Sequence, residues 1–157
     1  MRRFWRITKK RYALDKTCEG NRLNGGRWNK PGFGALYAAE TVELAALEKF
    51  VHTAGITPSD LVLAAVDVPD DTSLIRRVGI GDLPAGWNGL PASDAAQEFG
   101  TQWLKGAGEL VLLVPSVIVP ESMNAVINPL HLRYAEVRLM IIRDFRFDSR
   151  MFGGSGA

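Results

Sequence analysis

The sequence has few of the side chains that build disulfides and metal centres. Its 157 residues include one cysteine, Cys18, and two histidines, His52 and His131. A disulfide within the chain needs two cysteines, and a cysteine-rich zinc site needs three or four. The counts therefore exclude an intramolecular disulfide and a cysteine-rich metal site, and they argue against a histidine-built centre. We expect no metal.

Long apolar runs and a strong net charge are also missing. The densest apolar run, 110–114, has the length of a strand, whereas a membrane span needs ~20 apolar residues. The basic segment 1–12 is not followed by the apolar stretch of a secretory signal. A net charge of +2 is too small to indicate a nucleic-acid or membrane partner. We therefore expect a cytoplasmic protein without direct contact to nucleic acid or membrane.

The composition that is present is that of a folded globular chain. Hydrophobic residues make up 46% of the sequence and charged residues 23%. At ~150 residues per domain the length corresponds to about one domain. We find no internal repeat and no long linker, so the sequence predicts a single domain over residues 1–152 and a short flexible tail at 153–157.

Hydrophobic patterning and turn residues predict short strands, two helices and long glycine loops. Thr41 and Ser93 are suited to cap helices over 42–52 and 94–105. Segment 4–7 has the pattern of an edge strand, and segments 21–34, 79–91 and 124–129 have that of irregular loops. Further strands are predicted at 35–39, 60–68, 74–78, 109–114, 117–119 and 136–147. This mixture predicts an α+β fold.

One loop and two polar residues could carry chemistry. The loop GGRWN at 25–29 holds Arg27, whose guanidinium suits bidentate phosphate recognition, and Trp28, which could cover a pocket. The loop has neither Walker nor GxGxxG spacing, and spacing alone favours a tight loop with an exposed arginine and a packed tryptophan. Glu48 lies at the edge of a helical apolar stripe, so it either reaches solvent or points into a cleft. Ser116 lies outside any GxSxG motif, yet its hydroxyl could bind a phosphate or another hydroxyl.

The ordered set of these segments resembles the RES domain family over nearly the whole chain. The first half matches through GGRWN, Tyr37 and the helical sequence AALE that ends at Glu48. The second half matches, in the same order, through LLVPS ending at Ser116, VPE at 119–121, Asn124 and NPLH at 128–131. Each motif is short, but their order is specific.

The resemblance implies a fold, a substrate and a partner. RES proteins are toxins of bacterial type II toxin–antitoxin pairs, partnered by Xre-type antitoxins, with a fold similar to ADP-ribosyltransferases such as diphtheria toxin. They act on NAD, and some members convert NAD and phosphate to nicotinamide and ADP-ribose phosphate. We therefore expect an NAD phosphorylase in a hetero-oligomer with its antitoxin, with NAD as substrate, phosphate as possible co-substrate and no cofactor. The alternatives are a protein ADP-ribosyltransferase and a non-enzymatic nucleotide-binding module.

The resemblance also assigns residues, and general chemistry then suggests their roles. The implied catalytic set is Arg27, Tyr37, Glu48 and Ser116. The implied substrate-binding set is Gly26, Arg27, Trp28, Tyr37 and Asn128. Breaking the nicotinamide–ribose bond builds positive charge on the ribose, which a carboxylate such as Glu48 can stabilise. Arg27 would pair with the pyrophosphate, Tyr37 would face the nicotinamide, and Ser116 would bind the ribose, a phosphate or the nucleophile.

Overall fold

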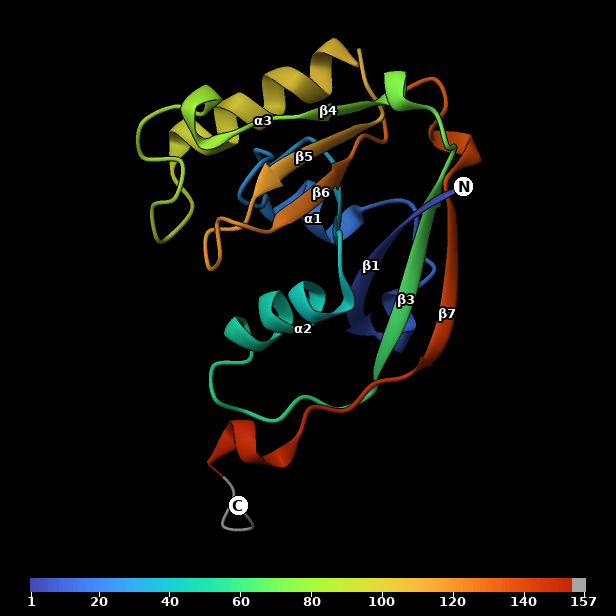
Figure 1. The fold of residues 1–157 in the computed structure, drawn as a ribbon, viewed down its shortest axis with the longest axis vertical. Coiled ribbons are helices and arrows are strands. Elements are labelled where there is room, and N and C mark those ends of the chain that lie inside the picture. The colour runs from blue at the N-terminus through green and yellow to red at the C-terminus, as the bar shows by residue number, and fades with distance from the viewer. Residues whose placement is uncertain (154–157) are drawn as a thin grey trace.

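The computed structural model describes residues 1–153, which form one seven-stranded sheet and three α-helices (Figure 1). The strands are β1 (Arg2–Lys9), β2 (Leu36–Ala39), β3 (Leu61–Val68), β4 (Ile75–Arg77), β5 (Val111–Pro115), β6 (Met123–Ile127) and β7 (Arg138–Asp144). The helices are α1 (Glu19–Asn24), α2 (Val42–Val51) and α3 (Asp94–Gly106). The α+β prediction is confirmed. The predicted tail lies, beyond Gly153, outside the described residues.

The sheet has the order β4-β5-β6-β2-β1-β3-β7 and divides between β2 and β1. All neighbouring strands are antiparallel except β4 and β5. β1 pairs with β3 along its whole length, from Arg2 to Lys9, but it meets β2 at the single pair Trp5↔Ala39. The sheet therefore consists of a half β4-β5-β6-β2 and a half β1-β3-β7, which run in different directions in Figure 1.

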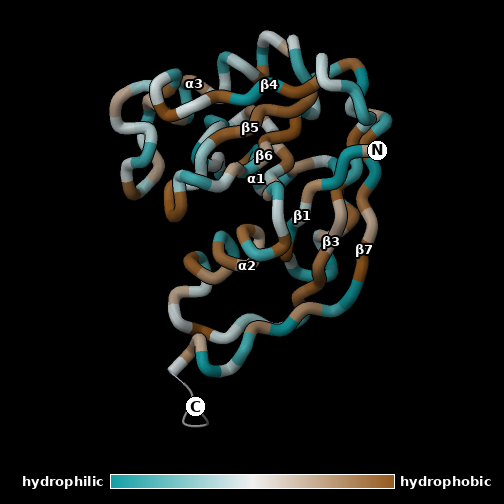
Figure 2. Tube along the Cα trace, in the orientation of Figure 1, coloured by the Kyte–Doolittle hydropathy of each residue, from teal (hydrophilic) through white to brown (hydrophobic). Residues whose placement is uncertain are grey.

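Each half of the sheet is packed against one helix. α3 covers the first half through an apolar cluster that includes Trp28, Trp103 and Leu112. α2 packs on the second half through a cluster that includes Ile7 and Leu44. Figure 2 shows β3, β5 and β6 as the most continuously hydrophobic segments, as expected for strands covered by these helices. Among residues 1–153, no helix has the combination of length and apolar character that a membrane span requires.

Both helix caps agree with the sequence prediction. The Thr41 hydroxyl accepts a hydrogen bond from the Leu44 amide at 3.1 Å, and the Ser93 hydroxyl accepts one from the Ala96 amide at 3.1 Å. A side-chain oxygen at this position satisfies a backbone N–H that has no partner within the helix. The start of α2 is therefore fixed by local chemistry, and this start sets where Glu48 faces.

Four segments differ from the prediction. Segment 4–7 is not an edge strand, because β1 lies between β2 and β3 in the interior of the sheet. Segment 117–119 is not a strand, because the Ser116 side-chain oxygen accepts hydrogen bonds from the Ile118 and Val119 amides and closes a turn. The following strand is β6, in a segment predicted to be mostly irregular. The predicted loop 21–34 also begins inside helix α1.

Candidate active site

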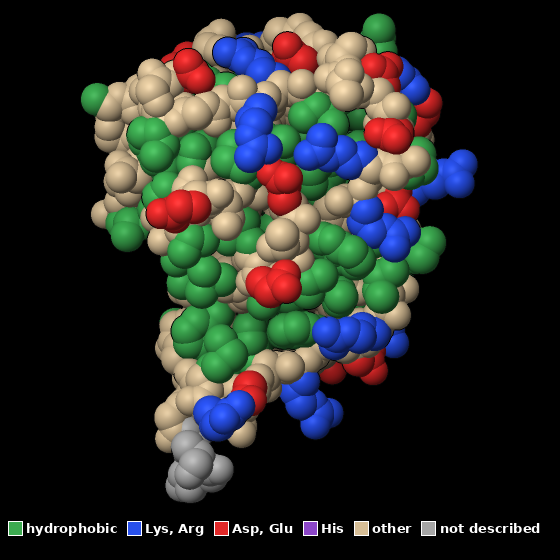
Figure 3. Space-filling view, in the orientation of Figure 1, with side chains coloured by type: hydrophobic (Ala, Val, Ile, Leu, Met, Phe, Trp, Pro, Cys, Tyr) green, Lys and Arg blue, Asp and Glu red, His purple; other side chains and the backbone are tan. Residues whose placement is uncertain are grey.

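A cleft of about 1,110 Å³ opens where the two halves of the sheet part. Its volume slightly exceeds the ~300–1,000 Å³ typical of small-molecule sites. Five of the predicted catalytic and substrate-binding residues line it, namely Gly26, Arg27, Trp28, Tyr37 and Glu48. Figure 3 shows apolar side chains gathered on the face that carries α2, one wall of this cleft.

Glu48 points from α2 into the cleft and is held through one oxygen. Its Oε1 accepts a hydrogen bond from the Ser116 hydroxyl at 2.7 Å and another from the Asn124 amide nitrogen at 2.7 Å. Of the two placements left open by the sequence, the structure selects the cleft. The two hydrogen bonds fix the orientation of the carboxylate, because both donors converge on the same oxygen.

Ser116 is fully buried behind Glu48 and does not line the cleft. Its oxygen accepts hydrogen bonds from the Ile118 amide at 3.1 Å and the Val119 amide at 3.3 Å. Because these two N–H groups occupy its acceptor side, the hydroxyl hydrogen is directed at Glu48. In this structure Ser116 therefore positions the carboxylate and has no open path to a ligand.

Arg27 joins the glycine loop to the loop 84–92 across the cleft. Its Nη1 donates to the backbone oxygens of Trp87 and Gly89, each at 2.9 Å. Burial lowers the pKa of the guanidinium, and the nearby Glu48 carboxylate opposes that shift. One nitrogen of the fork is thus committed to holding the loop, while the side chain still lines the cleft.

Tyr37 is locked into the glycine loop by its hydroxyl group. The hydroxyl accepts a hydrogen bond from the Trp28 amide at 3.0 Å and donates one to the side-chain oxygen of Asn29. Burial raises the pKa of this hydroxyl above its usual value, so it stays neutral. A Cβ atom at Gly26 would lie 2.8 Å from the Tyr37 oxygen and 2.8 Å from the Asn29 side-chain oxygen, so this position requires glycine. The ring of Tyr37 is left as a wall of the cleft.

Two members of the predicted substrate-binding set, Trp28 and Asn128, are buried and held by contacts within the protein. The Trp28 side chain is only 3% exposed and stacks on Trp87 with ring centroids 6.3 Å apart, which is the packed tryptophan of the simpler interpretation. Asn128 is fully buried and does not line the cleft. Its side chain donates to the Leu104 backbone oxygen at 2.9 Å and accepts from the Leu130 amide at 3.0 Å. The structure therefore separates Asn128 from the other predicted residues.

Several polar residues that line the cleft were not among the predicted site residues, and three of them bear on the chemistry of the cleft. Arg6, Lys49 and Asn124 all line it. Arg6 Nη1 is buried without a hydrogen-bond partner among residues 1–153, and burial lowers the pKa of its guanidinium. Burial also lowers the pKa of Lys49, with contributions from the charges of Lys9 and Arg6. An arginine two residues after the buried Phe4 shares its face of a strand, and this alternation is the signal that could have identified Arg6.

The cleft therefore combines three cations with one carboxylate. Arg6, Arg27 and Lys49 line it together with Glu48. Cations that are partly removed from water favour an anionic ligand, and a guanidinium favours phosphate in particular. The fixed carboxylate can stabilise positive charge that develops on the same ligand.

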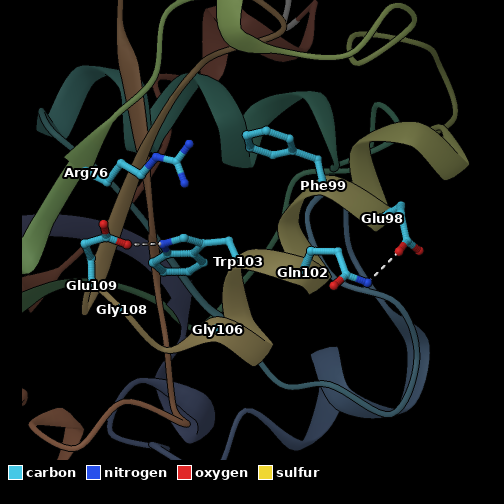
Figure 4. Close-up of a pocket in the computed structure, with 8 residues that line it drawn as sticks. All are labelled: Arg76, Glu98, Phe99, Gln102, Trp103, Gly106, Gly108 and Glu109. Atoms are coloured by element: carbon cyan, nitrogen blue, oxygen red, sulfur yellow. Dashed lines mark hydrogen bonds between the residues drawn. The ribbon is translucent and has the colours of Figure 1, made fainter.

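A second, smaller hollow of about 480 Å³ lies between α3 and β4 (Figure 4). Its polar side chains are largely paired with each other. The Trp103 indole nitrogen donates to Glu109 at 3.1 Å, and the Gln102 amide nitrogen donates to Glu98 at 2.7 Å. None of the residues selected from the sequence lines it, so the larger cleft is the candidate site. Within residues 1–153, no three side chains of the His, Cys, Asp and Glu types lie close enough together to hold a metal ion.

Comparison with known proteins identifies the family of the chain. The model of the RES domain matches residues 3–148. The chain is 39% identical over 153 residues to the "Prs ADP-ribosylating toxin" of Sphingobium sp. (strain YBL2), covering 94% of this chain and 95% of that one. It is 35% identical over 151 residues to "Toxin Res" of Yersinia enterocolitica, covering 94% and 97%.

A solved structure has the same fold at low sequence identity. It is the M. tuberculosis MbcT–MbcA toxin–antitoxin complex, with a TM-score of 0.67 and 19% identity over 96% of this chain and 86% of that one. The family match spans both halves of the sheet and every residue of the cleft described above. The chain belongs to the RES domain family.

Proposed function

We propose that this chain is the toxin of a toxin–antitoxin pair and that its cleft cleaves NAD at the nicotinamide–ribose bond, transferring ADP-ribose to inorganic phosphate. The observation that carries the proposal is the Glu48 carboxylate, fixed in the cleft by Ser116 and Asn124 at 2.7 Å each. Membership of the RES domain family and the toxin names of two relatives support it.

The proposed reaction uses the charge of Glu48 at the breaking bond. When the bond between C1′ of the ribose and the nicotinamide nitrogen breaks, its electron pair goes to the nitrogen, and the ribose becomes cationic. A carboxylate beside the ribose stabilises that cation more than it stabilises bound NAD, which lowers the barrier. A phosphate oxygen then bonds to C1′, giving nicotinamide and ADP-ribose phosphate without oxidation or reduction.

The three cations supply the binding of phosphate groups. NAD carries a pyrophosphate and the proposed acceptor is itself an anion, so two anionic groups need partners at once. Arg27 has donors beyond the Nη1 that holds the loop, and Arg6 Nη1 has no partner among residues 1–153. Lys49 lines the same cleft. We assign the ring of Tyr37 to the nicotinamide, as predicted from the sequence.

A second candidate is ADP-ribosylation of a protein with the same donor. The name of the Sphingobium relative, at 39% identity, favours it. The mouth of the cleft also carries exposed apolar side chains, with Leu90 81% exposed and Val51 50% exposed. Such a rim suits contact with another protein. In this case the acceptor would be a protein side chain in place of phosphate.

Product analysis separates these functions. Purified protein is incubated with NAD in phosphate-free buffer and in millimolar phosphate, and the products are identified by mass spectrometry. We expect ADP-ribose phosphate and faster NAD loss with phosphate. Plain ADP-ribose at equal rates would contradict the phosphorylase proposal, and ADP-ribose on an added protein would establish the second candidate. Binding of NAD without any turnover would leave a nucleotide-binding module.

We also propose an antitoxin of the Xre type as the partner, in a hetero-oligomeric complex that covers the cleft. The similar solved structure is titled a toxin–antitoxin complex, which supports an antitoxin partner for this chain. An enzyme that consumes NAD acts where NAD is abundant, so we place it in the cytoplasm. There it must be held inactive until it is needed, which requires such a partner.

A further inference from the structure

Two side chains, Ser116 and Asn124, donate hydrogen bonds to Glu48, and of these two only Asn124 lines the cleft. A carboxylate only accepts hydrogen bonds, so the amide nitrogen of Asn124 must be the group that faces Oε1, at 2.7 Å. This fixes the orientation of the amide. Its oxygen, Oδ1, is then directed away from that carboxylate oxygen.

The hydrogen bond between the two side chains leaves one free acceptor on each. Among residues 1–153, neither Glu48 Oε2 nor Asn124 Oδ1 has a hydrogen-bond donor, and both residues line the cleft. Two neighbouring acceptors without donors suit a ligand that offers two neighbouring donors. A vicinal diol, as in a ribose, has this arrangement.

The backbone of Asn124 is held by strand pairing on both sides, which suits precise recognition of such a ligand. Asn124 lies in the interior strand β6, where it pairs with Val114 of β5 and Ala39 of β2. Side chains on paired strands keep their positions better than side chains on loops, which favours precise recognition.

We propose that Asn124 accepts a hydrogen bond from the 3′-hydroxyl of the nicotinamide ribose while Glu48 accepts one from the 2′-hydroxyl. The inference rests on the proposed cleavage of NAD. Glu48 takes the 2′-hydroxyl because its charge is needed beside C1′, which is adjacent to C2′. Asn124, bonded to the far side of the same carboxylate, then meets the next hydroxyl. The pair thereby selects an intact ribose diol.

The test compares two variants on three substrates. The variants are Asn124→Ala and, as a matched control, Asn24→Ala, which changes another asparagine of the cleft that forms no hydrogen bond with Glu48. The substrates are NAD and its analogues lacking the 2′- or the 3′-hydroxyl of the nicotinamide ribose. Asn124→Ala also removes a hydrogen bond that positions Glu48, and this part of the loss in kcat/KM should be the same for all three substrates. The difference between substrates isolates the hydroxyl contact.

We expect Asn124→Ala to lower kcat/KM about tenfold more on NAD and the 2′-deoxy analogue than on the 3′-deoxy analogue. Asn24→Ala should change the three values by a common, small factor. If Asn124→Ala does not fold, Asn124→Ser carries the same comparison, since a serine hydroxyl is too short to reach the diol.

Two results would overturn the inference while leaving NAD cleavage in place. Equal losses on all three substrates would make Asn124 a positioning residue for Glu48 alone. A loss that disappears with the 2′-deoxy analogue would exchange the two assignments. A wild-type protein that releases no nicotinamide from NAD would instead overturn the proposed function, and this inference with it.

Discussion

Glu48 depends on groups from two distant parts of the sequence. α2 supplies the carboxylate, the turn after β5 supplies Ser116, and β6 supplies Asn124. Both donors bind Oε1, so the side chain is fixed through one oxygen while the other remains available to a ligand. The carboxylate is therefore oriented before a substrate binds. Electrostatic catalysis gains most from groups that need no reorganisation during the reaction.

Replacing Glu48 with glutamine separates its charge from its shape. The amide oxygen of the introduced side chain could accept the same two hydrogen bonds, so Glu48→Gln should fold with an unchanged melting temperature. We expect kcat for NAD cleavage to fall about a hundredfold or more, with a smaller change in KM, because the charge acts mainly in the transition state. Glu43→Gln, at an exposed position of the same helix, is the matched control. Near wild-type turnover in folded Glu48→Gln would reject Glu48 as the stabilising anion.

At the scale of elements, local signals predicted α2 and α3, while contacts distant in sequence decided the segments that were missed. The caps Thr41 and Ser93 are visible in the sequence because a helix start needs a side-chain acceptor. β6 is short, contains Asn124 and lies between prolines, so nothing local marks it as a strand. Its pairing with β5 and β2 is a property of the folded sheet.

The same distinction applies to the candidate site. Glu48, Tyr37 and Arg27 could be found because they belong to motifs with a family resemblance, and the structure brings them to one cleft. Lys49 became visible only when α2 was placed beside the cleft, whereas the alternation along β1 could have pointed to Arg6. Asn128 belongs to the motif of the second half, yet its side-chain amide forms its hydrogen bonds within the core. Membership of a motif alone therefore does not separate a structural residue from a functional one.

The contact between α3 and the glycine loop can be tested with two glycines of one helix. A Cβ atom on Gly100 would overlap the backbone oxygen and carbon of Trp28, whereas one on Gly106 would meet nothing within 4 Å. We expect Gly100→Ala to lower the free energy of unfolding by about 3 kcal/mol or more, at the upper end of overpacking effects, because backbone atoms must move. Gly106→Ala should be neutral or slightly stabilising. Urea unfolding measures both, and equal stabilities of the two variants would contradict this packing.

At the scale of the whole molecule, the function depends on where the sheet divides. A sheet continuous from β2 to β1 would close the space that the cleft occupies, but the two strands share only the pair Trp5↔Ala39. Residues from both halves therefore face one cavity, with Arg6 on β1 and Asn124 on β6. The net charge of +2 gives no hint of this, because the three cations of the cleft are balanced by acidic residues elsewhere. The local concentration of charge in the cleft, not the total charge of the chain, points to an anionic ligand.

The mouth of the cleft makes the antitoxin proposal testable. Leu90, 81% exposed, lines the cleft, whereas Ile56, 74% exposed, does not. If an antitoxin covers the cleft, an aspartate at the rim places an unpaired charge in the interface and weakens binding about tenfold or more. We expect Leu90→Asp to lose the complex with the co-expressed antitoxin on a sizing column and to release NAD turnover from inhibition. Ile56→Asp should keep both the complex and the inhibition. If Leu90→Asp retains the inhibited complex as tightly as Ile56→Asp, the antitoxin binds elsewhere and acts on the cleft from a distance.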